Sequence, residues 1–263
     1  MTEWTAVGDD GVLVRSRWIY NCYLIPDAGN GAPLVVDVGV PSHGRAVADW
    51  LAHRVDDAVA RLPLVAATHL HADHVGGLPA LEAHRHRATT VVLPERARAY
   101  AEGETPRTPG PREVARILPV LRSQPFSFAA LWEAARSPRV GYGVGRFALP
   151  ADAPHWIGEG EHPGGATEWV ALVVPGHTDD STAYYHAPTR TLVSGDAVLT
   201  VDGRAWFNPE YVDGAASAET EDRLRGLRVD VLLPGHGRPL VGHDLLAGAL
   251  GHDDRPASRR RRR

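Results

Sequence analysis

Four apolar segments of this sequence share one pattern, because each ends in a histidine or an aspartate. "LPLVAATH" ends at His69, "VALVVPGH" at His177, "TLVSGD" at Asp196 and "VDVLLPGH" at His236. A short apolar run bounded by turn residues indicates a strand that is buried on both faces. Such strands belong to layered α/β folds, in which ligands bind near the ends of strands. We therefore expect a layered α/β domain whose polar residues meet at the strand ends.

The first of these segments runs directly into a histidine cluster, "THLHADHVGG", at residues 68–77. Its candidate metal ligands are His69, His71, Asp73 and His74. Imidazole nitrogens and carboxylate oxygens together suit zinc, iron or manganese. Isolated histidines elsewhere, such as His53, are interpreted as ordinary surface residues. Because one loop rarely closes a metal site, the later strand ends at His177, Asp196 and His236 are the expected partners.

Strand and helix patterns alternate along the chain, which indicates one domain over residues 1–245. A helical stretch at about residues 95–140 interrupts the pattern and is interpreted as an insert. Residues 246–263, which end in five arginines, are expected to form a disordered Arg-rich tail. The formal net charge is −4 even with that tail, so the body is acidic. An acidic body binds polyanions poorly, so a nucleic-acid partner is not expected.

The remaining composition favours a cytoplasmic protein with a small-molecule substrate. The beginning of the sequence shows no basic segment followed by an apolar one, so no signal peptide is expected. No apolar run approaches the ~18 residues that span a bilayer, so no membrane partner is expected either. Cys22 is the single cysteine, which excludes an intramolecular disulfide. Nothing in the sequence indicates an oligomeric state.

Five segments together resemble the metallo-β-lactamase-fold superfamily. They are "VVDVGV", with Asp37 and Gly39, followed by "THLHADHVGG", "PGHTDDS", "VSGDAVL" and "LLPGHGRP". The resemblance covers about residues 12–240. It implies an αββα sandwich, in which two mixed β-sheets pack face to face with helices outside and a metal site lies at one edge.

The resemblance also implies a division of the ligands between two divalent metal ions. The first ion would be held by His69, His71 and His177. The second would be held by Asp73, His74 and His236, and Asp196 would bridge the two. Zinc is the expected metal, with manganese or iron as alternatives. A hydroxide bridging the ions would be the nucleophile, Asp73 would act as the catalytic residue that orients it and passes on a proton, and Asp37 would hold a histidine's other nitrogen.

Within this superfamily the sequence favours a hydrolase of a small-molecule carboxylic ester, thioester or lactone. The true β-lactamases usually lack an aspartate equivalent to Asp196 and are exported. The alternative from a different reaction class is a persulfide dioxygenase with one iron on His69, His177 and Asp196. A phosphodiesterase or nuclease is a further alternative, which the acidic body disfavours.

Three aromatic residues are candidate substrate contacts. Phe128 and Trp132 share one face of a helix in the insert, which could form a lid over the metals. Packing of both rings onto the sandwich is the alternative interpretation. Tyr185 lies in a strand just after His177, and a tyrosine hydroxyl there could donate to a developing oxyanion. Asp179 and Asp180 directly follow His177 and Thr178, and are interpreted as turn and cap residues rather than as a binding site for a cation.

Overall fold

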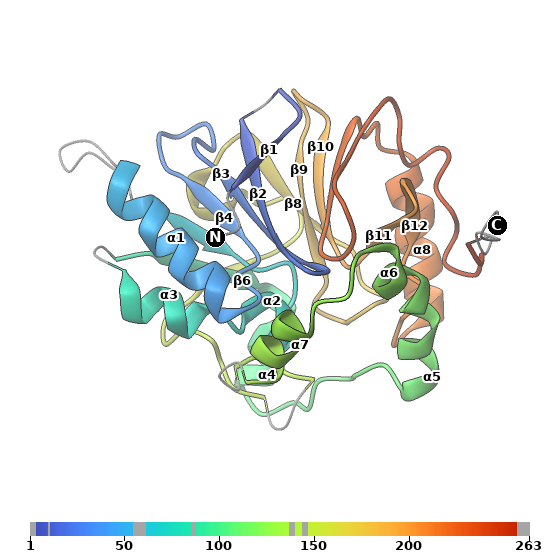
Figure 1. The fold of residues 1–263 in the computed structure, drawn as a ribbon, viewed down its shortest axis with the longest axis horizontal. Coiled ribbons are helices and arrows are strands. Elements are labelled where there is room, and N and C mark those ends of the chain that lie inside the picture. The colour runs from blue at the N-terminus through green and yellow to red at the C-terminus, as the bar shows by residue number, and fades with distance from the viewer. Residues whose placement is uncertain are drawn as a thin grey trace.

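The computed structural model describes residues 4–9, 11–54, 62–85, 88–136, 140–143 and 147–256. Within these residues two β-sheets face each other, and helices cover their outer sides (Figure 1). This arrangement confirms the αββα sandwich of mixed sheets. No helix in the described part of the chain is both long and apolar enough to cross a membrane.

The N-terminal half of the chain forms a seven-stranded sheet in sequential order. Its strands are β1 (Thr5–Val7), β2 (Val12–Arg17), β3 (Tyr20–Ile25), β4 (Leu34–Val36), β5 (Leu64–Ala66), β6 (Thr90–Pro94) and β7 (His155–Ile157). The pairs from β1 to β4 are antiparallel, and those from β4 to β7 are parallel. The parallel strands are joined by crossover helices, so their carboxyl ends lie at the same edge.

The C-terminal half forms a five-stranded sheet in the order β14-β13-β10-β9-β8. The bounds are β8 (Trp169–Val173), β9 (Thr182–His186), β10 (Thr191–Gly195), β13 (Val231–Pro234) and β14 (Leu240–Val241). Only the β10–β13 pair is parallel among these strands. A separate ribbon pairs β11 (Val198–Val201) with β12 (Arg204–Phe207).

Three clusters of buried side chains lie between the four layers of the sandwich. Between the sheets, Tyr23 of β3 packs in one cluster with Tyr184 of β9. The next residues along the same strands, Leu24 and Tyr185, point outward, because successive side chains of a strand face opposite sides. The first sheet's outer face packs against α1 (Pro41–Arg54) and α3 (Leu78–His84), and the second sheet's against α8 (Gly214–Arg225).

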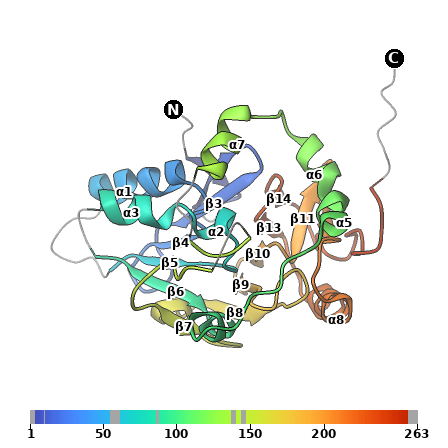
Figure 2. The same cartoon turned by 90° about the horizontal axis from the view of Figure 1, so that it is seen from below.

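The insert is helical, as expected, but its helices are short. They are α4 (Arg98–Ala101), α5 (Pro111–Val114), α6 (Leu118–Ser123) and α7 (Phe128–Ala135). In Figure 2, α7 lies on the side of α1 and α3, whereas α5 lies beside α8. The insert therefore runs from one helical layer to the other along one edge of the sandwich.

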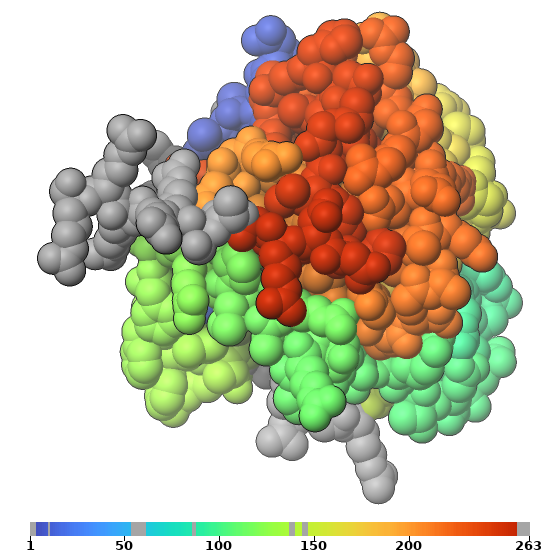
Figure 3. All heavy atoms as spheres, turned by 90° about the vertical axis from the view of Figure 1, so that its right-hand side faces the viewer, coloured from blue at the N-terminus to red at the C-terminus, as the bar shows by residue number. Residues whose placement is uncertain are grey.

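The expectation of a disordered tail from residue 246 is wrong for residues 246–256, which pack on the domain (Figure 3). Leu246 is fully buried in the cluster under α8. The Leu250 amide donates to the Ala205 carbonyl at 2.9 Å, and His252 contacts Glu221 at 2.6 Å. The burial of Leu246 and the hydrogen bonds to the rest of the domain hold this segment in place. The arginines at 259–263 lie outside the described residues.

Candidate metal centre

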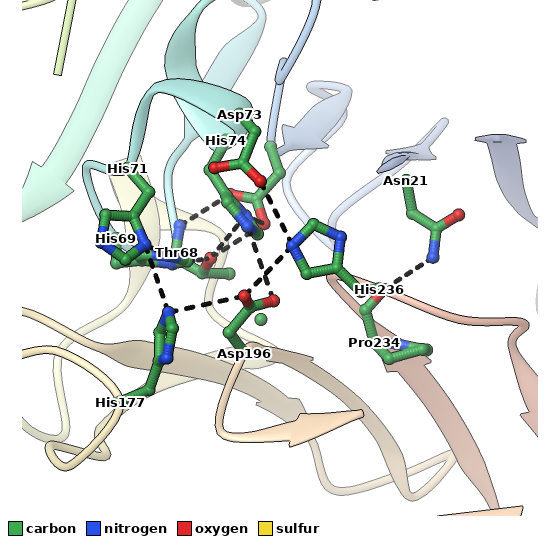
Figure 4. Close-up of polar contacts among 12 residues, drawn as sticks. Asn21, Thr68, His69, His71, Asp73, His74, His177, Asp196, Pro234 and His236 are labelled. Carbon is green, nitrogen blue, oxygen red and sulfur yellow. Dashed lines mark hydrogen bonds and ion pairs between the residues drawn. The ribbon is translucent and has the colours of Figure 1, made fainter. Parts of the chain in front are cut away.

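All seven predicted ligands meet at one end of the sandwich (Figure 4). The ligand atoms fall into three overlapping groups, and within each group they lie within 4.8 Å of one another. These groups are His69–His71–His177, His69–His74–Asp196 and Asp73–His74–His236. The seven residues come from the ends of β5, β8, β10 and β13 and from the short helix α2 (Ala72–Val75). Both sheets thus contribute to one cluster.

Three imidazole nitrogens converge at the first group. His69 Nε2 lies 3.1 Å from His71 Nδ1, which lies 3.2 Å from His177 Nε2. Burial lowers the pKa of His71 to about 3, with His177 adding to the effect. Burial likewise lowers the pKa of His69, together with the charge of His74. Neutral imidazoles that direct lone pairs at one point are the form of histidine that binds a metal ion.

Asp196 lies between the first group and the second. Its Oδ2 lies 3.5 Å from His177 Nε2 and 3.2 Å from His236 Nε2. Its Oδ1 lies 3.5 Å from His74 Nε2, and neither of these two buried atoms has a hydrogen-bond partner. On the far side, His236 Nε2 also lies 3.3 Å from Asp73 Oδ2. Buried polar atoms without partners are rare in native proteins and call for a missing ion or water.

Hydrogen bonds on the outer side hold the histidine rings in orientation. Asp37 Oδ2 lies 2.9 Å from His74 Nδ1, as expected for a residue that holds a histidine's other nitrogen. Asp37 also accepts from the amide and the hydroxyl of Thr68, both at 2.8 Å. His177 Nδ1 lies 2.7 Å from the Glu210 carbonyl, and His236 Nδ1 lies 3.2 Å from the carbonyl of Ile19. Such contacts direct the inner nitrogens at the cluster.

Electrostatics separate the second group from the first. Burial lowers the pKa of His74, but the carboxylates of Asp196 and Asp37 outweigh it and raise the pKa to about 10. For Asp73, burial opposes ionisation, yet the hydrogen bond with His236 brings the pKa well below its usual range. Two carboxylates therefore face this side of the cluster in their charged form, which suits a cation there.

Two glycines leave the space that the cluster needs. A Cβ on Gly235 would overlap Asp196 Oδ1 and would lie 2.6 Å from His74 Cε1. A Cβ on Gly39 would overlap the carbonyl of Asp73. Gly235 and Gly39 therefore let the ligand residues come close to the main chain, and neither glycine is needed for a special backbone angle. The donor types, their unpartnered atoms and this cleared space fit two divalent cations that share Asp196.

The two aromatic residues that the sequence predicts as substrate contacts in the insert are exposed and do not pack onto the sandwich. Phe128 and Trp132 are 68% and 52% exposed, and their rings stack on each other on the outer face of α7. The inner face of α7 instead carries buried Ala130 and Glu133, which pairs with Arg17 at 3.2 Å. Among the described contacts, neither aromatic ring touches any of the seven ligands. Helical periodicity identified the apolar face correctly, and its exposure contradicts the alternative that both rings pack onto the sandwich. Contact of these rings with a substrate stays a prediction.

The prediction for Tyr185 is wrong. Tyr185 lies on the outer face of the second sheet, where its hydroxyl donates to the Arg228 carbonyl at 2.8 Å. The inward residue is Tyr184, whose hydroxyl donates to the carbonyl of Ala67 at 2.9 Å. The sequence showed that one of the two must face inward, but it did not show which one.

Of the two aspartates after His177, Asp180 supports the site from behind and Asp179 does not. Asp180 is buried, and it accepts from the Leu70 amide at 2.9 Å and from the hydroxyl of Tyr142. The ring of Tyr142 packs edge-on against His71, 4.7 Å between centroids. Asp179 forms an ion pair with Arg107. From the sequence, Tyr142, just beyond the insert, was a candidate for apolar surface at the substrate site, and its contacts with His71 and Asp180 were not predicted.

Comparisons with known proteins agree with this geometry. The sequence profile of the metallo-beta-lactamase superfamily matches residues 15–236. A relative from Bacillus subtilis (strain 168), named "Probable metallo-hydrolase YflN", is 26% identical over 259 residues, which cover 90% of this chain and 86% of the relative.

Solved structures share the fold. A "Beta-lactamase domain protein from Burkholderia ambifaria" matches with a TM-score of 0.54 at 18% identity, over 94% of this chain and 73% of that one. "TTHA1623 in a di-iron-bound form" matches with a TM-score of 0.52 at 21% identity, over 87% of this chain and 92% of that one. At these identities the likeness concerns the fold alone.

Proposed function

The chain belongs to the metallo-beta-lactamase superfamily, and on that premise we propose that it is a dinuclear metal-dependent hydrolase of a small-molecule carboxylic ester, thioester or lactone. One observation carries the proposal. The carboxylate of Asp196 lies between two sets of ligands, with one oxygen near His177 and His236 and the other near His74. A carboxylate in this position can be shared by a pair of metal ions.

In this proposal His69, His71 and His177 hold one ion, while Asp73, His74 and His236 hold the other. Zinc suits these nitrogen and oxygen donors, and manganese or iron is the alternative. Two divalent ions would supply the Lewis acidity that activates water at neutral pH and polarises the carbonyl under attack.

Asp73 has the position for proton transfer. Its side chain is 33% exposed, whereas those of Asp196 and His236 are at most 6% exposed, so Asp73 lies on the open side of the cluster. Its lowered pKa keeps it ionised, so a carboxylate oxygen of Asp73 can accept a hydrogen bond from water and orient that water. In this proposal Asp73 also passes a proton from the water to the leaving alkoxide or thiolate. The network of Asp37 and Thr68 meanwhile keeps His74 in one orientation.

Metal content separates this proposal from the mononuclear alternative. We would measure zinc, manganese and iron per chain in wild-type protein, in His236→Ala and in His84→Ala. His84 is exposed and bonds only the carbonyl of Ala80 in its own helix, so it is the matched control. The expected result is two zinc or manganese ions in the wild type and control and one in His236→Ala, with turnover of an ester, thioester or lactone. One iron that His236→Ala leaves in place, with oxygen uptake on a persulfide, would instead identify the dioxygenase.

A further inference from the structure

The insert exposes an apolar patch that the metal centre does not use. Phe126, Phe128 and Trp132 are 63%, 68% and 52% exposed, and no other aromatic side chain in the described part of the chain is as open. The Phe128 and Trp132 rings stack with 6.4 Å between their centroids, and Leu131 of the same helix is also exposed. These four residues are called the α7 patch. In Figure 2, α7 lies at the rim of the molecule, where such a patch is open to a partner.

The helix that carries the patch is fixed to the sandwich by its other side. The carboxylate of Glu133 accepts from the amide and the hydroxyl of Ser42, at 2.6 and 3.0 Å. Arg17 Nε donates to the same carboxylate at 3.2 Å. At the start of α7, the Ala130 amide donates to Ser127 Oγ at 3.2 Å. The patch is therefore held facing outward by a well-anchored helix.

The charges around the patch are mostly positive, whereas the whole chain carries a net charge of −4. Within residues 118–136, Arg122 and Arg136 are exposed, and the single acid is Glu133, which is 15% exposed. Arg17 and Arg45 both approach Glu133, at 3.2 and 3.6 Å, and neutralise it. Arg122 and Arg136 form no ion pair with any residue that the structure describes. Their charges therefore remain available to an anionic partner.

This combination of groups fits an anionic lipid surface. Aromatic rings bind at the boundary of the acyl chains, and guanidinium groups bind the lipid phosphates. Arg136 Cζ lies 4.2 Å from the centre of the Trp132 ring, so a ring and a cation are presented together. A second copy of the chain fits less well, because a symmetric contact between two patches would place arginines against arginines.

The patch also lies close to the metal centre. Ala134 of α7 packs against the buried cluster that contains Tyr20. The Tyr20 ring in turn lies 5.7 Å from the ring of His236, between centroids. A lipid surface bound by the patch would therefore adjoin the end of the sandwich at which the seven ligands meet.

We infer that the α7 patch docks this protein peripherally on an anionic lipid surface. A peripheral contact needs one exposed face and no spanning helix, so the lack of a long apolar run does not argue against it. The inference goes beyond the proposed function, because this contact requires neither a bound metal ion nor a hydrolysable substrate.

Sedimentation with lipid vesicles tests the contact. Zinc-loaded wild type, Phe128→Ser/Trp132→Ser and Arg122→Gln/Arg136→Gln would be mixed with vesicles of phosphatidylcholine alone and of equimolar phosphatidylcholine and phosphatidylglycerol. Val241→Ser is the control, because Val241 is 62% exposed but lies on β14 of the second sheet. Urea unfolding verifies that each variant is folded, as expected for replacements of exposed side chains.

We expect wild type to bind the phosphatidylglycerol vesicles at least tenfold more tightly than the phosphatidylcholine vesicles. On the phosphatidylglycerol vesicles, Phe128→Ser/Trp132→Ser should weaken binding at least tenfold and Arg122→Gln/Arg136→Gln at least fivefold, while Val241→Ser stays within twofold. Equal binding of wild type and Phe128→Ser/Trp132→Ser would overturn the inference. Absence of wild-type sedimentation with both kinds of vesicle would overturn it as well.

Sedimentation equilibrium without lipid tests the other occupant. Monomeric wild type is the expected result. A wild-type dimer that Phe128→Ser/Trp132→Ser converts to a monomer would assign the patch to a contact between copies and would overturn the lipid inference. The outcome is independent of the proposed function, because a failure to hydrolyse any ester, thioester or lactone leaves the vesicle measurements unchanged.

Discussion

Replacing Asp37 with asparagine should weaken metal binding at His74 without unfolding the protein. Asp37 accepts three hydrogen bonds, from the amide and hydroxyl of Thr68 and from His74 Nδ1. An ionised carboxylate accepts only, so in the neutral form of His74 that binds a metal the proton sits on Nδ1 and the lone pair of Nε2 faces the cluster. In Asp37→Asn, the side-chain oxygen of the asparagine must accept the hydrogen bond from the Thr68 N–H. The NH₂ group then faces His74 Nδ1, which moves the His74 proton to Nε2.

The size of the effect follows from these contacts. Residues that orient a metal ligand typically contribute about 10- to 100-fold in affinity, or about 1.4–2.8 kcal/mol. Stability of the metal-stripped protein should fall by about 1–3 kcal/mol, because a charge-assisted bond is lost. The backbone adds little strain, since asparagine tolerates the positive φ of 60° at this position.

Competition with a chromophoric chelator measures the two zinc affinities, and urea unfolding in excess chelator measures stability. Asp179→Asn is the control and should lose at most about 1 kcal/mol with unchanged zinc affinity, because its ion pair with Arg107 is partly exposed. A folded Asp37→Asn protein that binds two zinc ions with wild-type affinity would refute the reasoning, because Asp37 would then not determine the His74 tautomer.

Three further substitutions test other parts of the structure. Gly235→Ala should cost about 1–3 kcal/mol of metal binding, roughly 5- to 150-fold, because its methyl group would overlap Asp196; zinc titration measures it, and an unchanged affinity would contradict the close approach. Burial lowers the pKa of His43 in the folded protein to about 3, whereas the unfolded value is near 6.5. The folded protein therefore keeps its full stability above pH 6.5 and loses part of it as the pH falls toward 3. His43→Leu should therefore reduce the fall in unfolding free energy between pH 7 and pH 5, and an identical slope in both proteins would count against this account. Trp132→Ala should change stability by at most about 0.5 kcal/mol in urea, since the ring is half exposed on α7, whereas a loss above about 2 kcal/mol would show that the outer face is packed.

Local pattern was sufficient for the parts of the site that lie at strand ends. His69, His177, Asp196 and His236 each follow an apolar run and a tight turn, and the structure brings all four together. Resemblance to a known family added the layer order and the division of ligands. Each single motif is carried by residues close together in the sequence, which is why its pattern could be recognised.

Predictions that depended on direction in space were less successful. Alternation required one of Tyr184 and Tyr185 to face inward, but the choice depends on the strand's register against its neighbours. The apolar face of α7 is exposed, whereas Glu133 on another face pairs with Arg17, which is 116 residues away in the chain. Residues 246–256 are ordered because Leu246 reaches a cluster under α8.

The sequence by itself identified the donors of a metal site, because ligand types and their local spacing can be read along the chain. Seven nitrogen and oxygen donors, most of them following apolar strands, predict that site. The tertiary structure decided how the site is arranged. It brought Asp196 between His177 and His236, and it oriented the histidine rings so that one nitrogen of each faces the cluster. Those outcomes depend on contacts between distant segments, whose free energies exist only once both sheets have packed.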